Sequence, residues 1–498
     1  MEHVDDATRK KLFSEEAAMS KPNDRYAVYQ DPVVERYASG EMSANFSAQK
    51  KFGTWRRLWV ALARAERKLG LKITAAQIAE MEKFVDDINF AEAEARERET
   101  RHDVMAHVYA YGLQAKSAKP IIHLGATSCY VGDNADLIIM RSALTIVFRR
   151  LLNVIDRLAA FALKYKDTPT LGYTHFQPAQ PTTVGKRATL WLQDLMTDLD
   201  ELARRIDGMR FLGNKGTTGT QASFLELFEG DVDKVNRLEG LIAEEMGFDA
   251  CFDVTGQTYP RKVDAMVLAT LSGVAQSAHK FANDLRLLMH LREVEEPIGE
   301  KQVGSSAMAY KRNPRQSELI TALARHVIVL ANDPAFTAAS QWLERTLDDS
   351  ANRRVSISGA FLATDGMLRV MLNVVSGLVV NEAVIRRHLM EELPFVATEN
   401  ILMTAVKAGG DRQELHEQIR AHAHAAAKRM KETGEPNDLL ARLKSYPAFA
   451  GANMDAALEP SQYVGLAPLQ TENYVRNVVR PALEPFTDEL GEKPDFSL

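Results

Sequence analysis

Apolar residues recur at helical spacing through the middle of the chain. The clearest stripe runs from Val267 to Leu288 with gaps that alternate between four and three residues, a heptad pattern typical of helices packed in a left-handed bundle. Further stripes cover Trp191–Ile206 and Leu137 to about Leu163, the latter after Asp133 and Asn134 as plausible caps. Strand-like alternation is scarce. Because helices of about 30 residues exceed the usual mean of about 11–12, the pattern predicts an all-α bundle of long helices.

The 498 residues exceed one ordinary core and suggest about three domains. We predict an N-terminal helical domain over residues 1–127, a central long-helix bundle over 128–380 and a C-terminal helical domain over 381–498. From Pro436 onward the last 63 residues hold seven of the 18 prolines, which indicates shorter helices there. Polar loops with Gly or Pro separate the predicted helices, at 122–128, 174–183, 213–223 and 296–314.

Charge and cysteine content narrow the class of protein. With 61 Lys+Arg against 67 Asp+Glu the net charge is -6, so the chain has no excess of cations to neutralise a nucleic-acid backbone. A small anionic substrate remains compatible, because its site needs only a few convergent cations. Two cysteines without metal-ligand spacing favour a reducing, cytoplasmic location. The start lacks the apolar run of a secretory signal, and the most apolar stretch, near Val370–Val380, is short of the ~20 residues that span a bilayer.

Several kinds of cofactor chemistry have no counterpart in the sequence. No segment matches the phosphate loop that ends in Gly-Lys-Ser/Thr or the dinucleotide pattern Gly-x-Gly-x-x-Gly. His416 and Glu417 begin a zinc-protease pattern, but Arg420 stands where the second histidine is required. We therefore expect no cofactor, no metal, and neither a nucleic-acid nor a membrane partner.

Separate polar segments carry residue types suited to an anionic substrate. Arg101-His102-Asp103 stands at the entry to a helix and is followed by the small-residue loop 123–128, whose backbone N–H groups and hydroxyls could meet a carboxylate. A plain turn that caps the next helix is an equal reading. His175, within 172–182, has the neutral-range pKa that suits a general acid, although most loop histidines are simply satisfied polar groups. The segment 216–223 could equally be an ordinary connection.

The segment from Gly304 to Pro314 reads Gly-Ser-Ser-x-Met-x-x-Lys-x-Asn-Pro, with Glu318 four residues beyond. It resembles the signature of the fumarase/aspartase superfamily, whose members release fumarate by elimination. A Gly/Ser linker would not account for the adjoining Lys311, Asn313 and Glu318. The resemblance implies an all-α fold of three domains, a central bundle shared in a homotetramer, and active sites that each take loops from three chains.

Within that superfamily the chain is similar to the adenylosuccinate lyase family, in the form found in animals and fungi, over nearly its whole length. The segments that carry this likeness are Arg36–Ser39, Arg101–His107, His123–Asn134, Thr174–Arg187, Thr255–Tyr259 and Glu344–Arg354. The resemblance implies small-molecule nucleotide substrates and β-elimination of fumarate in purine nucleotide biosynthesis. The substrates that it implies are adenylosuccinate, which would give AMP, and the succinylaminoimidazole-carboxamide ribotide (SAICAR), which would give AICAR.

The resemblance also implies roles for single residues. Ser305 matches the general base and His175 the general acid, with Glu318 orienting that histidine. The substrate-binding residues that it implies are Arg36, Tyr37, Arg101, His102, Asp103, Thr127, Ser128, Gln257, Lys311, Asn313, Arg345, Ser350 and Arg354. Among these, His102 would position the substrate, and Lys311 and Asn313, with Thr127 and Ser128, would stabilise the carbanion. Judged from the residues alone, Arg345, Arg353 and Arg354 could instead pair with Asp348 and Asp349 along one helix.

Two positions depart from the family pattern. Ala309 stands where proline usually follows the methionine, which frees the backbone of the open loop. Leu319 stands where close relatives often carry arginine. Two other interpretations remain open: another lyase of the superfamily, or a catalytically silent helical protein, against which the retained polar residues of the motifs argue.

Overall fold

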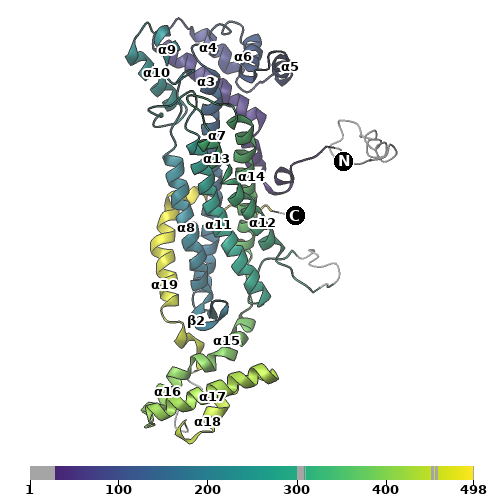
Figure 1. Ribbon diagram of the computed structural model, residues 1–498, viewed down its shortest axis with the longest axis vertical. Helices are drawn as coiled ribbons and strands as arrows, with labels where there is room; N and C mark the ends of the chain where they lie inside the picture. Colours follow the sequence, from purple (N-terminus) through teal and green to yellow (C-terminus); the bar gives the residue numbers. More distant parts are fainter. Residues whose placement is uncertain (1–27, 300–307, 309, 450–453, 455–457, 497–498) are drawn as a thin grey trace, which may run out of the picture.

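An elongated bundle of long helices forms the centre of the molecule, with shorter helices at both ends (Figure 1). The computed structural model describes residues 28–299, 308, 310–449, 454 and 458–496. The bundle helices are α7 (Ser128–Lys164), α8 (Val184–Asp207), α11 (Lys262–His290), α12 (Arg315–Leu330) and α14 (Asp349–Ser376). The all-α, long-helix prediction is confirmed. On α11 the predicted stripe residues Val267, Leu271, Val274, Ala278 and Phe281 are all fully buried.

Shorter helices cover the upper end of the bundle in Figure 1. They are α3 (Ala48–Lys68), α4 (Ala75–Lys83), α5 (Phe90–Thr100), α6 (Asp103–Gln114), α9 (Ala222–Leu227), α10 (Val232–Glu245) and α13 (Asp333–Ala339). The preceding η3 (Val33–Tyr37) and α2 (Gly40–Asn45) lie beside the bundle, against the middle of α14 and α7. Side-chain caps set several of their starts, as at Ser47 and Thr74, whose hydroxyls accept backbone N–H groups of the first turn.

The C-terminal part divides between two places. Helices α15 (Glu382–Val396), α16 (Thr398–Lys407), α17 (Arg412–Thr433), α18 (Leu439–Lys444) and η4 (Pro447–Phe449) lie at the lower end, and a small core joins α16–α18 and η4. The chain then returns to the bundle through η6 (Pro460–Tyr463), α19 (Ala467–Tyr474), η7 (Val475–Val479), α20 (Arg480–Leu483) and η8 (Glu484–Glu489). Val475, Val479 and Leu483 belong to the main core. The domain boundaries stay predictions.

The start of α7 differs from the sequence prediction. The helix begins at Ser128, after the extended Thr127, so Asp133 and Asn134 do not cap it and are buried inside it. Asp and Asn are common helix caps, but here both side chains are hydrogen-bonded to residues that are distant in the sequence. The Asn134 amide accepts the backbone N–H of Leu212 at 3.0 Å and donates to the carbonyl of Gly213 at 2.8 Å.

The segment 174–183, predicted as a loop, is part of a β-hairpin. Strands β1 (Pro169–Thr174) and β2 (Gln177–Thr183) pair antiparallel, with Leu171 opposite Pro181. Prolines are tolerated because both strands of a two-stranded ribbon are edges and need not donate on their outer side. A second short pair joins β3 (Val294–Glu295) to β4 (Val379–Val380). The hairpin lies at the lower part of the bundle in Figure 1.

Two helical segments are long and apolar enough to cross a membrane by length and composition alone. One is α14, whose most apolar window is 78% buried inside the protein, as expected of a core helix. The other covers Arg315–Ala339 and is 33% buried. The sequence prediction singled out the stretch near Val370, which overlaps the end of α14, and did not single out Arg315–Ala339.

Candidate active site

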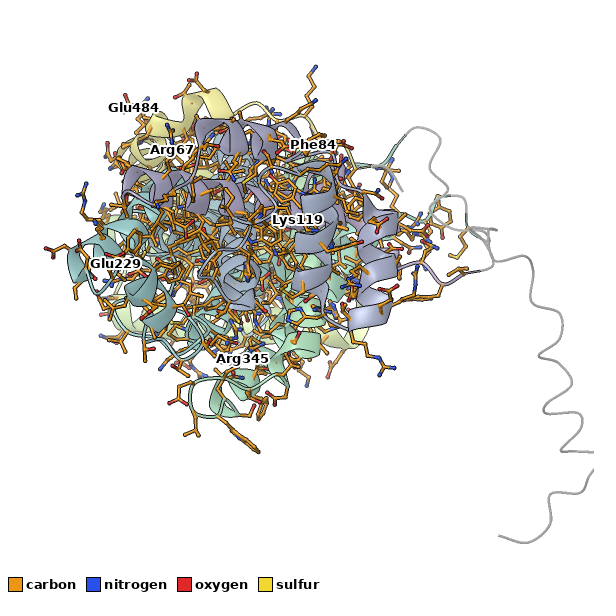
Figure 2. The ribbon with its side chains drawn as sticks, turned by 90° about the horizontal axis from the view of Figure 1, so that it is seen from above. Arg67, Phe84, Lys119, Glu229, Arg345 and Glu484 are labelled. Atoms are coloured by element: carbon orange, nitrogen blue, oxygen red, sulfur yellow. The ribbon has the colours of Figure 1, made fainter. Side chains whose placement is uncertain are left out.

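A cleft of about 680 Å³ opens at the upper end of the bundle. It brings together eight of the predicted substrate-binding residues, namely Arg101, His102, Asp103, Ser128, Gln257, Arg345, Ser350 and Arg354. Figure 2 looks down on this end and shows Arg345 at the edge of the molecule. Thr127 immediately precedes the first residue of α7 at the same place.

Three helices point their N-termini at this cleft. Helix α6 begins at Asp103, α7 at Ser128 and α14 at Asp349, and all three residues line the cleft. Helix N-termini carry unpaired N–H groups and the positive end of the helix dipole, so they favour anions. The sequence prediction that Arg101-His102-Asp103 enters a helix is confirmed. The local fold therefore supplies an anion-binding cleft before any charged side chain is considered.

His102 is held in one tautomer by its own helix. The backbone N–H of Met105 donates to its Nδ1 at 3.3 Å, and Nε2 lies 3.3 Å from the Ser128 hydroxyl. Because Nδ1 accepts, the proton of the neutral ring is on Nε2 and points at the hydroxyl oxygen. The Ser128 hydroxyl accepts this bond and keeps its own proton to donate into the cleft.

The loop before Ser128 is fixed from below by His123. Its Nδ1 accepts a hydrogen bond from the indole N–H of Trp59 at 2.9 Å, and its backbone takes the left-handed conformation with φ 67°. Burial, followed by the nearby His102, lowers the pKa of His123 to about 4. The ring is therefore neutral at physiological pH and acts as a fixed support for the loop.

A buried ion-pair network lies under the cleft. Arg261, with 1% of its side chain exposed, donates to Asp133 at 2.8 Å and to Asp349 at 2.6 Å. Asp349 also accepts from Arg345 at 3.2 Å. Burial alone would lower the pKa of Arg261, but the Asp133 carboxylate holds it above its usual value. Arg261 is shared between the two carboxylates, and Arg345, with 25% of its side chain exposed, pairs with Asp349 from the side that lines the cleft.

The alternative that the arginines pair with Asp348 and Asp349 along one helix is wrong: only Arg345 pairs with one of these acids, and it precedes the first residue of α14. It contacts Asp349, four residues on. Arg353 instead reaches carboxylates on α7 and α11. Arg354 lies 3.7 Å from Asp103, across the cleft, with 64% of its side chain exposed. The three arginines therefore contact different parts of the protein, and the exposed Arg354 can reach a ligand in the cleft.

Cys129, which lines the cleft, was missed by the sequence prediction. Its thiol donates to the Gln257 amide oxygen at 3.3 Å, and the Gln257 amide nitrogen donates to the carbonyl of Thr217 at 3.2 Å. Burial raises the pKa of Cys129 to about 12, so the thiol stays protonated as a donor. The only signal was its place directly after Ser128. Lys51, on α3, also lines the cleft and lay in no motif.

Arg36 and Tyr37 do not line this cleft. They lie on η3, which packs against the middle of α14: the Ser39 N–H donates to Asp365 at 2.6 Å. Asp365 is 16 residues along α14 from the start at Asp349, or about 24 Å at about 1.5 Å per residue. One chain therefore does not bring Arg36 and Tyr37 to the predicted ligands that line the cleft.

His175 lies far from the cleft in the same chain. It is exposed at the turn of the β1–β2 hairpin, which begins five residues after α7 ends. Ser128 and Lys164 mark the two ends of α7, about 54 Å apart at about 1.5 Å per residue. The general acid and the anion-binding cleft are therefore at opposite ends of one long helix.

The signature segment also lies away from the cleft, at the start of α12, where Arg312 contacts Glu295 of β3 at 3.1 Å. Lys311 and Asn313 precede α12, and Glu318 is in its first turn. Gln316, beside them, is hydrogen-bonded to Asn373, which is 24 residues along α14 from Asp349, about 36 Å at about 1.5 Å per residue. Ser305 and Ala309 lie outside the described residues.

Leu319 is half-buried and packs on the core. The structure gives no further role to this departure from the family pattern. Among the residues that the structure describes, no group of three or more His, Cys, Asp or Glu side chains is placed to hold a metal ion.

Residues 25–329 match the family described as Lyase, and residues 394–474 match the adenylosuccinate lyase C-terminus. The chain is 53% identical over 473 residues to the adenylosuccinate lyase of Saccharomyces cerevisiae, which covers 94% of this chain and 98% of that protein. The chain belongs to the adenylosuccinate lyase family. The family member of Schizosaccharomyces pombe is 52% identical with the same coverage, and that of Schistosoma mansoni is 45% identical over 95% of this chain and all of that protein.

Solved structures confirm the superfamily fold of this adenylosuccinate lyase family member. A 3-carboxy-cis,cis-muconate lactonizing enzyme from Pseudomonas putida matches with a TM-score of 0.75 at 24% identity, covering 90% of this chain and 98% of that one. A fumarate lyase from a Mesorhizobium species matches with a TM-score of 0.72 at 25% identity, covering 90% and 99%. These structures confirm the predicted fold, and the family matches with the yeast relatives confirm the predicted resemblance to the adenylosuccinate lyases.

Proposed function

We propose that the chain is an adenylosuccinate lyase that eliminates fumarate from adenylosuccinate to give AMP, and from SAICAR to give AICAR. The observation that carries this proposal is the cleft in which Arg345, Arg354 and the Ser128 hydroxyl gather at three helix N-termini. Adenylosuccinate has a phosphate and two carboxylates, and arginine holds such oxygens in a planar fork. Arg101, which also lines the cleft, has no ion-pair partner in the described part of the chain.

The proposed reaction is a β-elimination. Ser305 removes a Cβ proton from the succinyl group, and His175, oriented by Glu318, protonates the departing nitrogen. The electron pair left by the proton moves toward the neighbouring carboxylate before the C–N bond breaks, so fixed donors and cations there lower the barrier most. Lys311 and Asn313, with Thr127 and Ser128, supply them in this proposal, and no cofactor is needed.

The proposed active site is shared between three chains of a homotetramer. Support comes from helix lengths: in one chain about 54 Å separates the cleft from the start of the His175 hairpin, and about 36 Å separates it from the start of α12, at about 1.5 Å per helical residue. Side chains reach only a few ångströms, so the groups meet only if different copies contribute them.

Exposed apolar side chains supply the surface for such an assembly. Val329, Phe336, Trp342, Leu343, Leu347 and Val355 are all more than two-thirds exposed. They lie on α12, α13, the start of α14 and the segment between the last two. Large exposed apolar surfaces mark protein–protein contacts. In the proposed tetramer, other copies of the chain cover this surface.

The two cysteines are both free, which supports the cytoplasmic location proposed for the enzyme.

The test is turnover of adenylosuccinate followed by its ultraviolet absorbance change, with SAICAR as second substrate and argininosuccinate as the rival. We expect fumarate from the first two only; fumarate from argininosuccinate alone would assign another superfamily lyase. Near wild-type turnover by Ser305→Ala would exclude Ser305 as the base. Mixing inactive His175→Ala and Ser305→Ala proteins should restore part of the activity after subunit exchange, and no recovery would exclude shared sites.

A further inference from the structure

The turn that carries His175 has an unusual backbone. Thr174 pairs with Gln177 across the hairpin, which leaves His175 and Phe176 as a two-residue turn. Both have positive φ, 53° and 57°, as a type I′ turn requires. Such turns normally hold Asn-Gly, because the left-handed conformation is disfavoured for residues with bulky side chains. Strain of this kind persists only where the surroundings hold it.

Tyr173 is the residue that holds this turn to the rest of the protein. Its ring packs against that of Phe176 with 5.8 Å between the ring centroids. Its hydroxyl donates to the Glu293 carboxylate at 3.4 Å. On the same strand, the carbonyl of Leu171 accepts from the Arg187 guanidinium at 2.7 Å. The strand that leads into the turn is therefore anchored on both sides of Gly172, by the Leu171 carbonyl and by the Tyr173 side chain.

Glu293 connects the hairpin to two other parts of the chain. Its side chain is 1% exposed, and the oxygen that accepts from Tyr173 also lies 2.9 Å from Nδ1 of His388 on α15. Its carbonyl accepts the Asn381 N–H at 2.9 Å. It immediately precedes β3, from which the chain continues into the signature segment. Glu293 thus joins three parts of the chain: the hairpin, strand β3 at the start of the signature segment, and helix α15.

The arrangement of Tyr173, Arg187 and Glu293 does not serve stability alone. Within the described part of the chain, the second carboxylate oxygen of Glu293 and Nη1 of Arg187 are buried without a hydrogen-bond partner. Burial lowers the pKa of Arg187, and Glu293 is the main influence that opposes it, which shows that the two charges lie near each other. Unsatisfied buried polar atoms are rare and costly, so their retention beside a strained turn points to a role in function.

We propose that Tyr173 and Glu293 are positioning residues for His175. They hold the strained turn that presents His175 to the substrate, and they connect this turn to strand β3 at the start of the signature segment. The inference rests on the proposed role of His175 as the general acid. Neither residue needs to touch the substrate. Loss of the link lets the turn relax, so His175 is misplaced for proton transfer while the arginine cleft, at the other end of α7, still binds substrate.

The test compares kcat and KM for adenylosuccinate among substitutions of these two residues. Tyr173→Phe keeps the ring contact and removes one hydrogen bond, so we expect kcat to fall about threefold to tenfold. Glu293→Ala removes the whole link, and a misplacement of about 1 Å lowers kcat on the order of 100-fold. Glu293→Gln keeps an oxygen that accepts from Tyr173 and should recover part of that loss. KM should stay within about twofold in all three, since uniform binding is untouched.

Tyr165→Phe is the matched control. Its ring packs on Phe161 at the end of α7, 4.9 Å between centroids, and the same change there should leave kcat unaltered. Wild-type turnover and the inactivity of His175→Ala are measured first: failure of either refutes the proposed function or acid assignment rather than this link. If both hold, the inference is wrong should Tyr173→Phe keep wild-type kcat. It is also wrong if Glu293→Gln is no better than Glu293→Ala, or if KM rises in step with the loss of kcat.

Discussion

Replacing Glu66 by glutamine is expected to stabilise the protein by an amount that grows with pH. Glu66 lies on α3 with 0% of its surface exposed, and neither carboxylate oxygen has a hydrogen-bond partner among the described residues. Burial raises its pKa to about 9 from the ordinary 4.5. At pH 7 the folded protein therefore keeps the carboxyl protonated, whereas the unfolded chain ionises it.

The sign and size follow from this difference. Because the folded-state pKa is raised, the free energy of unfolding is at its full value below about pH 4.5. It falls as pH rises toward 9, since over this range the carboxyl ionises in the unfolded chain and stays protonated in the fold. Relative to a residue that cannot ionise, Glu66 costs about 1 kcal/mol at pH 5.5 and about 3 kcal/mol at pH 7. Glutamine has nearly the same shape and never ionises, so it removes this pH-dependent cost.

The assay is thermal unfolding of wild type and Glu66→Gln at pH 5.5, 7.0 and 8.5 and at one protein concentration, since assembly contributes to Tm. The midpoint of the variant should exceed that of wild type by more at each step in pH. Glu94→Gln, on the exposed face of α5, is the matched control and should show a constant small difference. A difference for Glu66→Gln that does not change between pH 5.5 and 8.5 would refute the reasoning, because it would mean that the carboxyl ionises normally in the fold.

Two further changes test the base of the cleft. Arg261→Met leaves the carboxylates of Asp133 and Asp349 buried without their main partner, so urea unfolding should show a loss of about 3–5 kcal/mol; a loss below about 1 kcal/mol would contradict the network described. Cys129→Val removes the thiol donor to Gln257 at nearly constant volume, so KM for adenylosuccinate should rise about threefold to tenfold. Cys129→Ser retains a donor and should keep a near wild-type KM, and equal effects of Val and Ser would rule out the hydrogen bond as the cause.

The local sequence pattern was enough to predict the long helices. It was not enough where the role of a residue depends on a partner that is distant in the sequence. The heptad stripe of α11 is buried as predicted, because repeated apolar spacing acts within one helix. Asp133 looked like a cap because its residue type caps helices, yet its partner Arg261 is 128 residues away. The hairpin around His175 was also unforeseen, since its pairing needs a two-residue turn at His-Phe, which no turn rule favours. Cys129 and Lys51 reach the cleft only through packing.

The sequence by itself determined the superfamily chemistry, the family and the long-helix bundle. Motifs such as Lys311-x-Asn313 and regular apolar stripes are short-range features that carry their meaning wherever the segment lies. Only the tertiary structure decided where these motifs stand. It gathers Arg101, Ser128 and Arg345 at one end and places His175 at the other, because a continuous helix of 37 residues is a rigid spacer of about 54 Å. Among the residues that it describes, the same structure also buries the Glu66 carboxyl with no hydrogen-bond partner, since burial depends on what packs around a helix and not on its own sequence.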